Sequence, residues 1–211
     1  PMYVTVYMVR NFEQGGAAVN QIARVAHATL SAVAVHELAL TTDFTQAPAM
    51  TEADFLSAVQ LGFNAVPQVC ELLCLGEMGI GNTTVASALC AALTHQSGTD
   101  WAGQGTGLDA AGTAHKATVT DTALAHHAAH LDAPPETARR LGGYELAATP
   151  GATPAARLMQ FPVILAGFVS TPAVAPIAHL PPHAPDPTRP PPPSTSPPSP
   201  ICTQANKISI Q

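Results

Sequence analysis

A glycine-rich turn followed by two threonines is the part of the sequence best suited to chemistry. Residues 76–88 read GEMGIGNTTVASA, with three glycines in six positions before an alanine-rich stretch. Glycine lets the backbone come close to a ligand, and the first N–H groups of a helix lack internal partners and favour anions such as phosphate. We therefore expect Gly79, Gly81, Asn82 and Thr83 to bind an anion, with Asn82 or Thr83 capping the helix. The alternative is a plain strand-to-helix turn.

A second glycine cluster follows at Gly105, Thr106 and Gly107, and Lys116 comes nine residues later on a predicted helix. A cation there could face an anionic group held between the two glycine turns, although a solvated lysine is the commoner arrangement. Neither turn carries the Gly-Lys-Ser/Thr of a Walker A loop, and the spacing is not that of a dinucleotide fingerprint.

Glu77 is an unusual residue inside an anion-binding turn, because a carboxylate and an anion repel each other. One interpretation is that Glu77 binds backbone donors or a hydroxyl group. The other is that it handles a substrate hydroxyl, a proton or a developing positive charge.

Several other function classes are disfavoured by the composition. Eight Lys and Arg against fourteen Asp and Glu give a net charge of −6, which argues against nucleic-acid binding. His126 and His130 have a spacing that two metal ligands can use, but no third ligand is in register, so we expect no metal or cofactor. The longest apolar stretch, residues 158–178, is broken by prolines, which argues against a membrane helix. The four cysteines form no zinc or disulfide pattern, which favours a reduced, cytoplasmic protein.

Proline divides the chain into two parts. Eleven of the 21 prolines fall within residues 181–200. Proline removes backbone donors and fixes φ, so neither helix nor sheet tolerates this density. We expect a folded domain over residues 1–178 and a disordered, Pro-rich tail over residues 179–211, in which an SH3-type ligand at residues 189–194 is a minor alternative.

Helix-like and strand-like patterns alternate before the tail. Periodicity and capping signals predict helices over residues 16–30, 51–66, 83–93, 113–130 and 135–141, and strands over residues 31–40, 71–75 and 162–169. Strands separated by helices of this length imply crossover connections. We therefore expect an α/β fold with a mostly parallel sheet that helices cover on both faces.

The glycine turns carry a resemblance to a known family. The GEMGIGNTT segment, together with Gly105-Thr106-Gly107 and Lys116, resembles the nicotinate-nucleotide–dimethylbenzimidazole phosphoribosyltransferases. GEMGIGNTT is long and specific. Three weaker segments extend the resemblance in the family's order, to roughly residues 3–178: YMVRNF with GGAAVN near the N-terminus, LGGYELAA at residues 141–148 and PVILAGFV at residues 162–169.

The resemblance implies an α/β fold with a Rossmann-like parallel sheet in a homodimer. It implies transfer of the 5-phosphoribosyl group from nicotinate mononucleotide to 5,6-dimethylbenzimidazole, which releases nicotinate and forms α-ribazole phosphate. It places the nucleotide's phosphate near Gly79, Gly105 and Lys116, and Glu77 beside the reacting centre, with no metal involved.

The sequence also departs from the family pattern. Ala166 stands where the family's PVLLDGF strand has aspartate, and the 211 residues contain neither the DHG region nor the SHxSxEPGH-type and RLGEGSGA-type segments, the last of which carries the proposed general base. The chain does not start with methionine. We therefore expect a partial domain whose tail arises from a shifted reading frame, with little or no turnover. The rival hypotheses are a module that binds nucleotide without catalysis and a chain that does not fold stably.

Overall fold

The computed structural model describes residues 2–105 and 107–178. Its elements are α1 (Met2–Glu13), α2 (Ala18–Val25), η1 (His36–Leu38), α3 (Glu52–Asn64), β1 (Leu73–Leu75), α4 (Asn82–Thr94), α5 (Gly98–Trp101), α6 (Ala110–His127), η2 (Ala128–His130), α7 (Pro134–Leu141), α8 (Tyr144–Leu158), β2 (Val163–Leu165) and α9 (Ser170–Ala178). The predictions made for Thr106 and for the tail at 179–211 fall outside the described residues.

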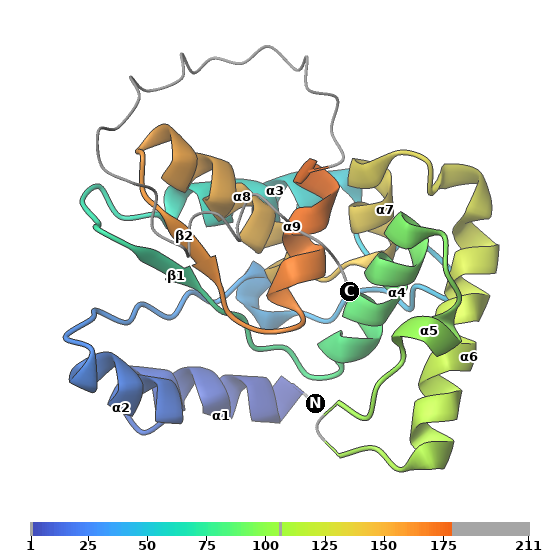
Figure 1. Ribbon diagram of the computed structural model, residues 1–211, viewed down its shortest axis with the longest axis horizontal. Helices are drawn as coiled ribbons and strands as arrows, with labels where there is room; N and C mark the ends of the chain where they lie inside the picture. Colours follow the sequence, from blue (N-terminus) through green and yellow to red (C-terminus); the bar gives the residue numbers. More distant parts are fainter. Residues whose placement is uncertain (1, 106, 179–211) are drawn as a thin grey trace, which may run out of the picture.

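Strands β1 and β2 form a two-stranded parallel sheet, in which Leu73 pairs with Val163 and Leu75 with Leu165. The predicted α/β fold with a parallel sheet is confirmed, although both strands are shorter than the sequence pattern indicated. Helices α3 and α8 cover one face of the sheet, where Leu73 and Val163 pack against α8 (Figure 1). Cys74 points to the opposite face and is exposed. Within the described residues, the expectation that helices cover both faces is therefore wrong.

Helices α3 and α8 approach each other closely enough to require glycine on both sides. A methyl group on Gly62 of α3 would overlap the carbonyl oxygen of Ala148, and one on Gly151 of α8 would overlap that of Val59. Helix α3 itself begins as predicted, because Thr51 Oγ1 accepts a hydrogen bond from the Asp54 N–H at 3.1 Å. The two glycines thus fix the position of α8 against α3.

Helix α8 joins two parts of the core. Its N-terminal half contributes Leu146 to a cluster with Leu89 of α4 and Leu141 of α7. Its C-terminal half contributes Ala155 and Ala156 to the cluster beneath the sheet. The first turn of α8 therefore lies next to α4, and this brings Glu145 to the candidate site described below.

Two predicted elements are wrong and one helix was not predicted, each for an identifiable reason. Residues 31–40 form no strand, because His36 and Glu37 have φ values of 49° and 50° within η1. The helix expected over residues 16–30 ends at Val25, since His27 has a φ of 53°. Helix α8 was missed because Pro150 and Pro154 lie within it. Burial of its alanines outweighs the hydrogen bonds that the prolines remove.

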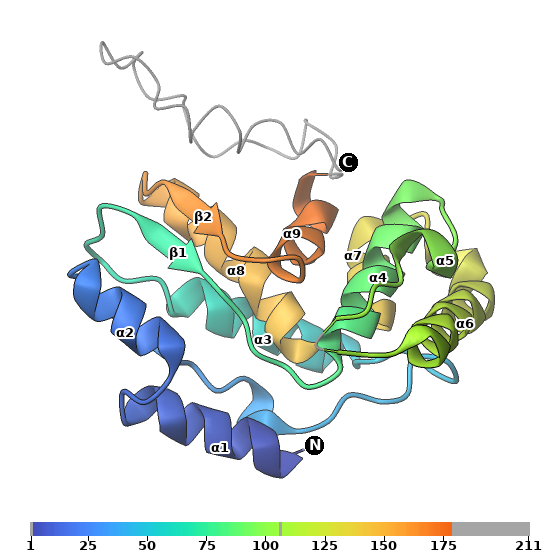
Figure 2. The ribbon, with the colours of Figure 1, turned by 60° about the horizontal axis from the view of Figure 1, so that its bottom comes forward.

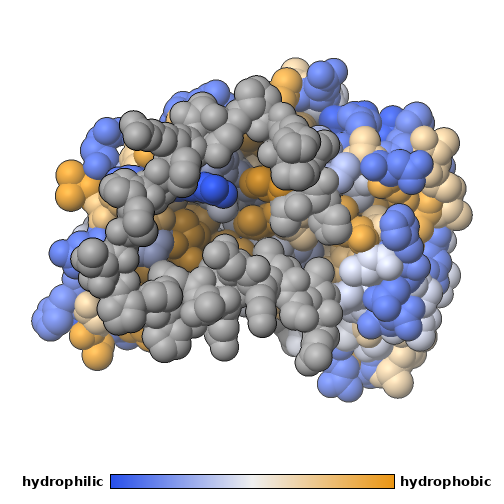
Figure 3. Space-filling view, turned by 45° about the horizontal axis from the view of Figure 1, so that its top comes forward, coloured by the Kyte–Doolittle hydropathy of each residue, from blue (hydrophilic) through white to orange (hydrophobic). Residues whose placement is uncertain are grey.

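The first two helices carry apolar side chains that face solvent. Tyr3 and Tyr7 of α1 and Ile22 and Val25 of α2 are exposed, with 91% of Tyr3 and 83% of Val25 accessible. Figure 2 shows α1 and α2 at one edge, away from α4–α7. On the face seen in Figure 3, apolar residues are interspersed with hydrophilic ones. None of the helices in the described part of the chain has the length and apolar character needed to cross a membrane.

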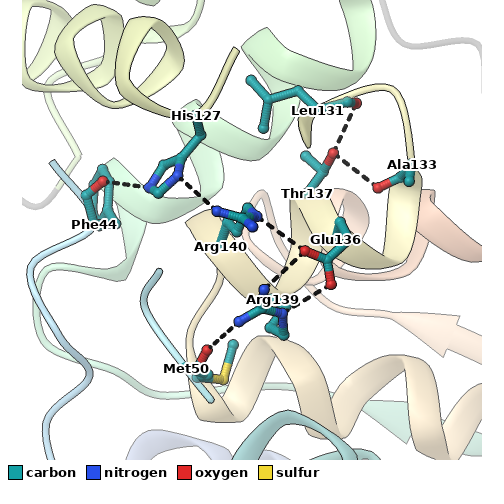
Figure 4. A network of polar contacts seen from close by, with 9 residues as sticks. All are labelled: Phe44, Met50, His127, Leu131, Ala133, Glu136, Thr137, Arg139 and Arg140. Carbon is teal, nitrogen blue, oxygen red and sulfur yellow. Dashed lines mark hydrogen bonds and ion pairs between the residues drawn. The ribbon is translucent and has the colours of Figure 1, made fainter. Parts of the chain in front are cut away.

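A polar network attaches the segment before α3 to α6 and α7 (Figure 4). Glu136 accepts hydrogen bonds from Arg139 and Arg140, and Arg139 also donates to the carbonyl oxygen of Met50 at 2.9 Å. The bonds from Arg139, followed by that from Arg140, lower the pKa of Glu136 to about 2. His127, only 1% exposed, bonds the Phe44 carbonyl oxygen through Nε2 at 2.9 Å. The network therefore holds two segments that are distant in sequence.

We expect His127 to make the protein less stable below neutral pH. Phe44 O can only accept and Arg140 can only donate, so Nε2 carries the proton and Nδ1, 3.5 Å from Arg140 Nη1, is bare. Burial lowers the pKa of His127 below the ordinary value near 6.5, so the unfolded chain takes up the proton first. This contribution is complete above about pH 6.5 and falls as the pH drops toward the folded-state pKa.

Urea unfolding at pH 7.5 and 5.5 tests this expectation. The variant His127→Gln keeps one donor and one acceptor but does not titrate, so its loss of stability on acidification should be smaller than that of the wild type. His115→Gln, at an exposed position of α6, should retain the wild-type dependence. An equal loss in wild type and His127→Gln would show that His127 is not responsible.

Candidate functional site

The two glycine turns meet at the amino group of Lys116. Lys116 Nζ donates hydrogen bonds to Thr83 Oγ1 at 2.9 Å and to the carbonyl oxygen of Gly103 at 3.1 Å. A methyl group on Gly105 would lie 3.2 Å from Thr83 Oγ1 and 3.4 Å from Lys116 Nζ. Figures 1 and 2 show the loop before α4 approaching the loop before α6. Lys116 is only 4% exposed, so the alternative of a solvated lysine is wrong.

Lys116 is a buried cation that has neutral partners. Among residues 2–105 and 107–178, no carboxylate oxygen lies within 4.0 Å of its Nζ atom. Burial lowers the pKa of Lys116, because the charged form loses hydration. A buried charge without a counter-charge is costly, and an anion bound beside Nζ would offset that cost. We call Lys116, Thr83, Gly103 and Gly105 the cationic end of the site.

A second group of polar side chains also lies at the first turn of α4. The Asn82 side-chain amide donates to Glu77 Oε2, and both residues lie within the GEMGIGNTT segment. Burial raises the pKa of Glu77; the Asn82 hydrogen bond opposes the rise, and the negative charge of Glu145 adds to it. Glu77 thus binds a side-chain amide rather than the backbone donors or hydroxyl considered from the sequence.

Glu145, in the first turn of α8, completes this acidic end. A methyl group on Gly79 would overlap Glu145 Oε1, and one on Gly143 would lie 3.0 Å from Glu145 Oε2. Burial raises the pKa of Glu145 as well. Sequence reasoning did not single out Glu145, although it lies two residues after a glycine pair and at the start of a helix, as Asn82 and Thr83 do. We call Glu77, Asn82 and Glu145 the acidic end of the site.

The remaining predicted residues fall around these two ends. Gly81 is the N-cap of α4 with a φ of 86°, and no side chain caps the helix, so the expected cap by Asn82 or Thr83 is wrong. Gly105 and Gly107 have φ values of 55° and 116°, which glycine adopts readily. Thr106 lies between them, outside the described residues. Among the described residues, no group of three or more His, Cys, Asp or Glu side chains could hold a metal ion.

The arrangement is polarised across one helical turn. Asn82 and Thr83 are consecutive, yet Asn82 bonds Glu77 and Thr83 bonds Lys116. A ligand that spans the first turn of α4 would meet a cation at one end and a carboxylate at the other. This suits a molecule with an anionic group and a centre that is, or becomes, positively charged.

Comparison with known proteins identifies relatives over most of the chain. A family model described as "Phosphoribosyltransferase" (DBI_PRT) matches residues 1–198. A nicotinate-nucleotide–dimethylbenzimidazole phosphoribosyltransferase of Mesorhizobium japonicum is 51% identical over 180 residues, which cover 85% of this chain and 54% of the relative. An enzyme of the same name from Ruegeria sp. (strain TM1040) is 49% identical over 183 residues, which cover 85% of this chain and 53% of the relative.

A solved structure has a similar fold. The crystal structure of CobT from Thermus thermophilus matches with a TM-score of 0.69 and 32% sequence identity, over 84% of this chain and 60% of that one. The chain spans about half the length of the curated relatives it matches. With a family model that matches residues 1–198 and identities near 50%, the chain belongs to the nicotinate-nucleotide–dimethylbenzimidazole phosphoribosyltransferase family.

Proposed function

We propose that this chain takes part in transferring the 5-phosphoribosyl group from nicotinate mononucleotide to 5,6-dimethylbenzimidazole, the reaction of cobalamin lower-ligand synthesis. The observation that carries the proposal is Lys116, a buried amino group between two glycine turns with no carboxylate partner among the described residues. The names of the relatives supply the two substrates.

The phosphate group fits the cationic end. Thr83 Oγ1 accepts from Lys116, so the hydroxyl proton of Thr83 is free to donate to a phosphate oxygen. Lys116 has three donors and uses two of them within the chain, which leaves the third for the ligand. The absence of a side-chain cap on α4 also suits an anion at this helix start.

The reacting carbon fits the acidic end. Positive charge develops on the ribose carbon as its bond to nicotinate breaks, and a carboxylate at Glu77 would stabilise that charge. When a benzimidazole nitrogen attacks the ribose carbon, the benzimidazole ring must lose a proton. A general base is therefore also required. Asn82 holds the Glu77 carboxylate in place, so the role that we propose for Asn82 is to position Glu77.

Two further properties are proposed with the function. We propose a cytoplasmic location, because the three described cysteines, Cys70, Cys74 and Cys90, are free thiols. We also propose a homodimer, following the family resemblance. The exposed apolar side chains of α1 and α2 are compatible with an interface.

Calorimetry with two ligands tests the phosphate assignment. Nicotinate mononucleotide and nicotinate riboside differ only in the phosphate, which would bond to Lys116 and Thr83. One hydrogen bond to a charged group contributes about 1.5–3 kcal/mol, and the phosphate would make two, so the nucleotide should bind at least roughly 10- to 150-fold more tightly. Equal affinities would contradict a phosphate site between the glycine turns.

A second candidate function is nucleotide binding without turnover. It is favoured by the cationic end, which offers a free Lys116 donor to a phosphate group whether or not the transfer reaction follows. Chromatographic detection of α-ribazole phosphate after incubation with both substrates separates the two candidates. Binding of nicotinate mononucleotide without any product would favour the second candidate. Steady product formation by the purified chain would exclude it and establish the transfer reaction.

A further inference from the structure

The acidic end brings together carboxyl groups from two distant parts of the chain. Glu77 follows β1, whereas Glu145 belongs to the first turn of α8. Asn82, the first residue of α4, lies beside both: its amide donates to Glu77 Oε2, and a methyl group on Gly79 would overlap Glu145 Oε1 and lie 3.0 Å from Asn82 Nδ2. The amide that binds Glu77 thus lies next to the carboxyl group of Glu145.

The surrounding backbone leaves little room for Glu145 to move away. Its Oε1 atom occupies the space that a side chain at position 79 would need, and its Oε2 atom lies close to Gly143. Gly79 does not have a positive φ, so close approach by Glu145 and Asn82 is the physical reason for glycine there. The glycines of two separate segments therefore accommodate the same carboxyl group.

Two negative charges in such a confined place are unfavourable. Burial removes the water that would hydrate each carboxylate, and a single amide can compensate only part of that loss. Carboxyl groups that interact in this way usually retain one proton between them and titrate as a pair. Among the described residues, Glu145 is the only charged group that acts on Glu77 through space.

We propose that Glu145 is a positioning residue for Glu77 and that the two carboxyl groups, held on Asn82, share one proton at neutral pH. The acidic end then carries one negative charge instead of two. One charge is enough to stabilise a positive ribose carbon, and it repels the phosphate at the cationic end less than two would. The catalytic meaning of the pair rests on the proposed function, but the sharing of a proton does not.

Carbon-13 NMR of the 211-residue chain labelled at the glutamate δ-carboxyl carbons tests the proposal directly. In the wild type, Glu77 and Glu145 should titrate in two separated steps, with at least one step well above the usual range for glutamate. In Glu145→Gln, the titration of Glu77 should become a single step at lower pH, because the repelling charge is gone. Glu52→Gln, at an exposed position in the first turn of α3, should leave the titration of Glu77 unchanged.

Two results would overturn the proposal. One is a wild-type titration in which both carboxyl groups ionise together in the usual range, which requires no variant and so does not depend on whether Glu145→Gln folds. The other is a Glu77 midpoint that does not move in folded Glu145→Gln. A residue that merely supports the fold would not shift that midpoint.

Two separate measurements distinguish the carboxyl pair from the proposed function. Calorimetry with nicotinate mononucleotide reports on the cationic end, whereas the NMR titration is recorded without ligand. Two-step titration without nucleotide binding would support the carboxyl pair and contradict the proposed function. Binding with ordinary, independent titrations would support the function and overturn the pair.

Discussion

Replacing Lys116 with methionine should weaken the binding of nicotinate mononucleotide by roughly 10- to 150-fold, the equivalent of one charge-assisted hydrogen bond of about 1.5–3 kcal/mol. The same variant should bind nicotinate riboside as the wild type does, because the riboside lacks the phosphate. Calorimetry with both ligands measures the two effects. The expectation follows from the position of Nζ between Thr83 and Gly103, where it has a donor to spare.

The free energy of unfolding of Lys116→Met should rise or stay unchanged, although its affinity for the nucleotide falls. Lys116 is buried among neutral partners, and removing a buried cation without a carboxylate partner relieves a desolvation cost. Methionine has a similar length and is apolar, so it fills the same space. The free energy of unfolding in urea should therefore equal or exceed that of the wild type, as expected for a residue retained for binding rather than for the fold.

The matched control is Arg157→Met, which removes an exposed cation from the last turn of α8. It should leave nucleotide binding unchanged. Two outcomes would argue against the cationic end as a phosphate site: similar losses of nucleotide binding in both variants, or a Lys116→Met variant that loses the nucleotide and the riboside equally. A clear loss of stability in Lys116→Met would show that its bonds to Thr83 and Gly103 support the fold.

The glycine turn of the cationic end could be predicted from sequence because its determinants are local. The glycine pattern of residues 76–81 and the threonine at position 83 predict a turn that opens a helix, and α4 begins at Asn82 as that pattern indicates. Lys116 could be associated with the turns only by its distance from Gly107 along the chain. Its burial depends on how α6 packs against α4, which no local pattern reveals.

The acidic end could be predicted only in part. Glu77 is conspicuous because a carboxylate is unexpected inside an anion-binding turn. Glu145 lies far from Glu77 along the chain, and what places it beside Gly79 is the packing of α8 against α3, together with the cluster that Leu146 forms with Leu89 of α4. Since α8 contains Pro150 and Pro154, its helical character was also hidden from propensity arguments. The position of Glu145 is therefore set by long-range packing, which no local sequence pattern reveals.

Replacing Gly62 with alanine should destabilise the protein by about 2 kcal/mol. The added methyl group would overlap the carbonyl oxygen of Ala148, a backbone atom that cannot rotate away, so overpacking should cost about 3 kcal/mol, the upper end of its usual range. The helix propensity of alanine would return about 1 kcal/mol of this. The melting temperature, measured by circular dichroism, should fall by roughly 4–8 °C, at about 2–4 °C per kcal/mol for a domain of this size.

A glycine in another helix provides the matched control. Gly112 of α6 has only the side chains of Leu108 and Asp109 near its missing methyl group, at 3.1 Å and 3.2 Å. Side chains can shift, so Gly112→Ala should remain close to wild type in stability. Gly151→Ala should resemble Gly62→Ala, because its methyl group would meet the Val59 carbonyl oxygen in the same interface. A wild-type melting temperature for Gly62→Ala would show that α3 and α8 can separate freely. In that case the position of Glu145 beside Gly79, which depends on this packing, would lose its structural basis.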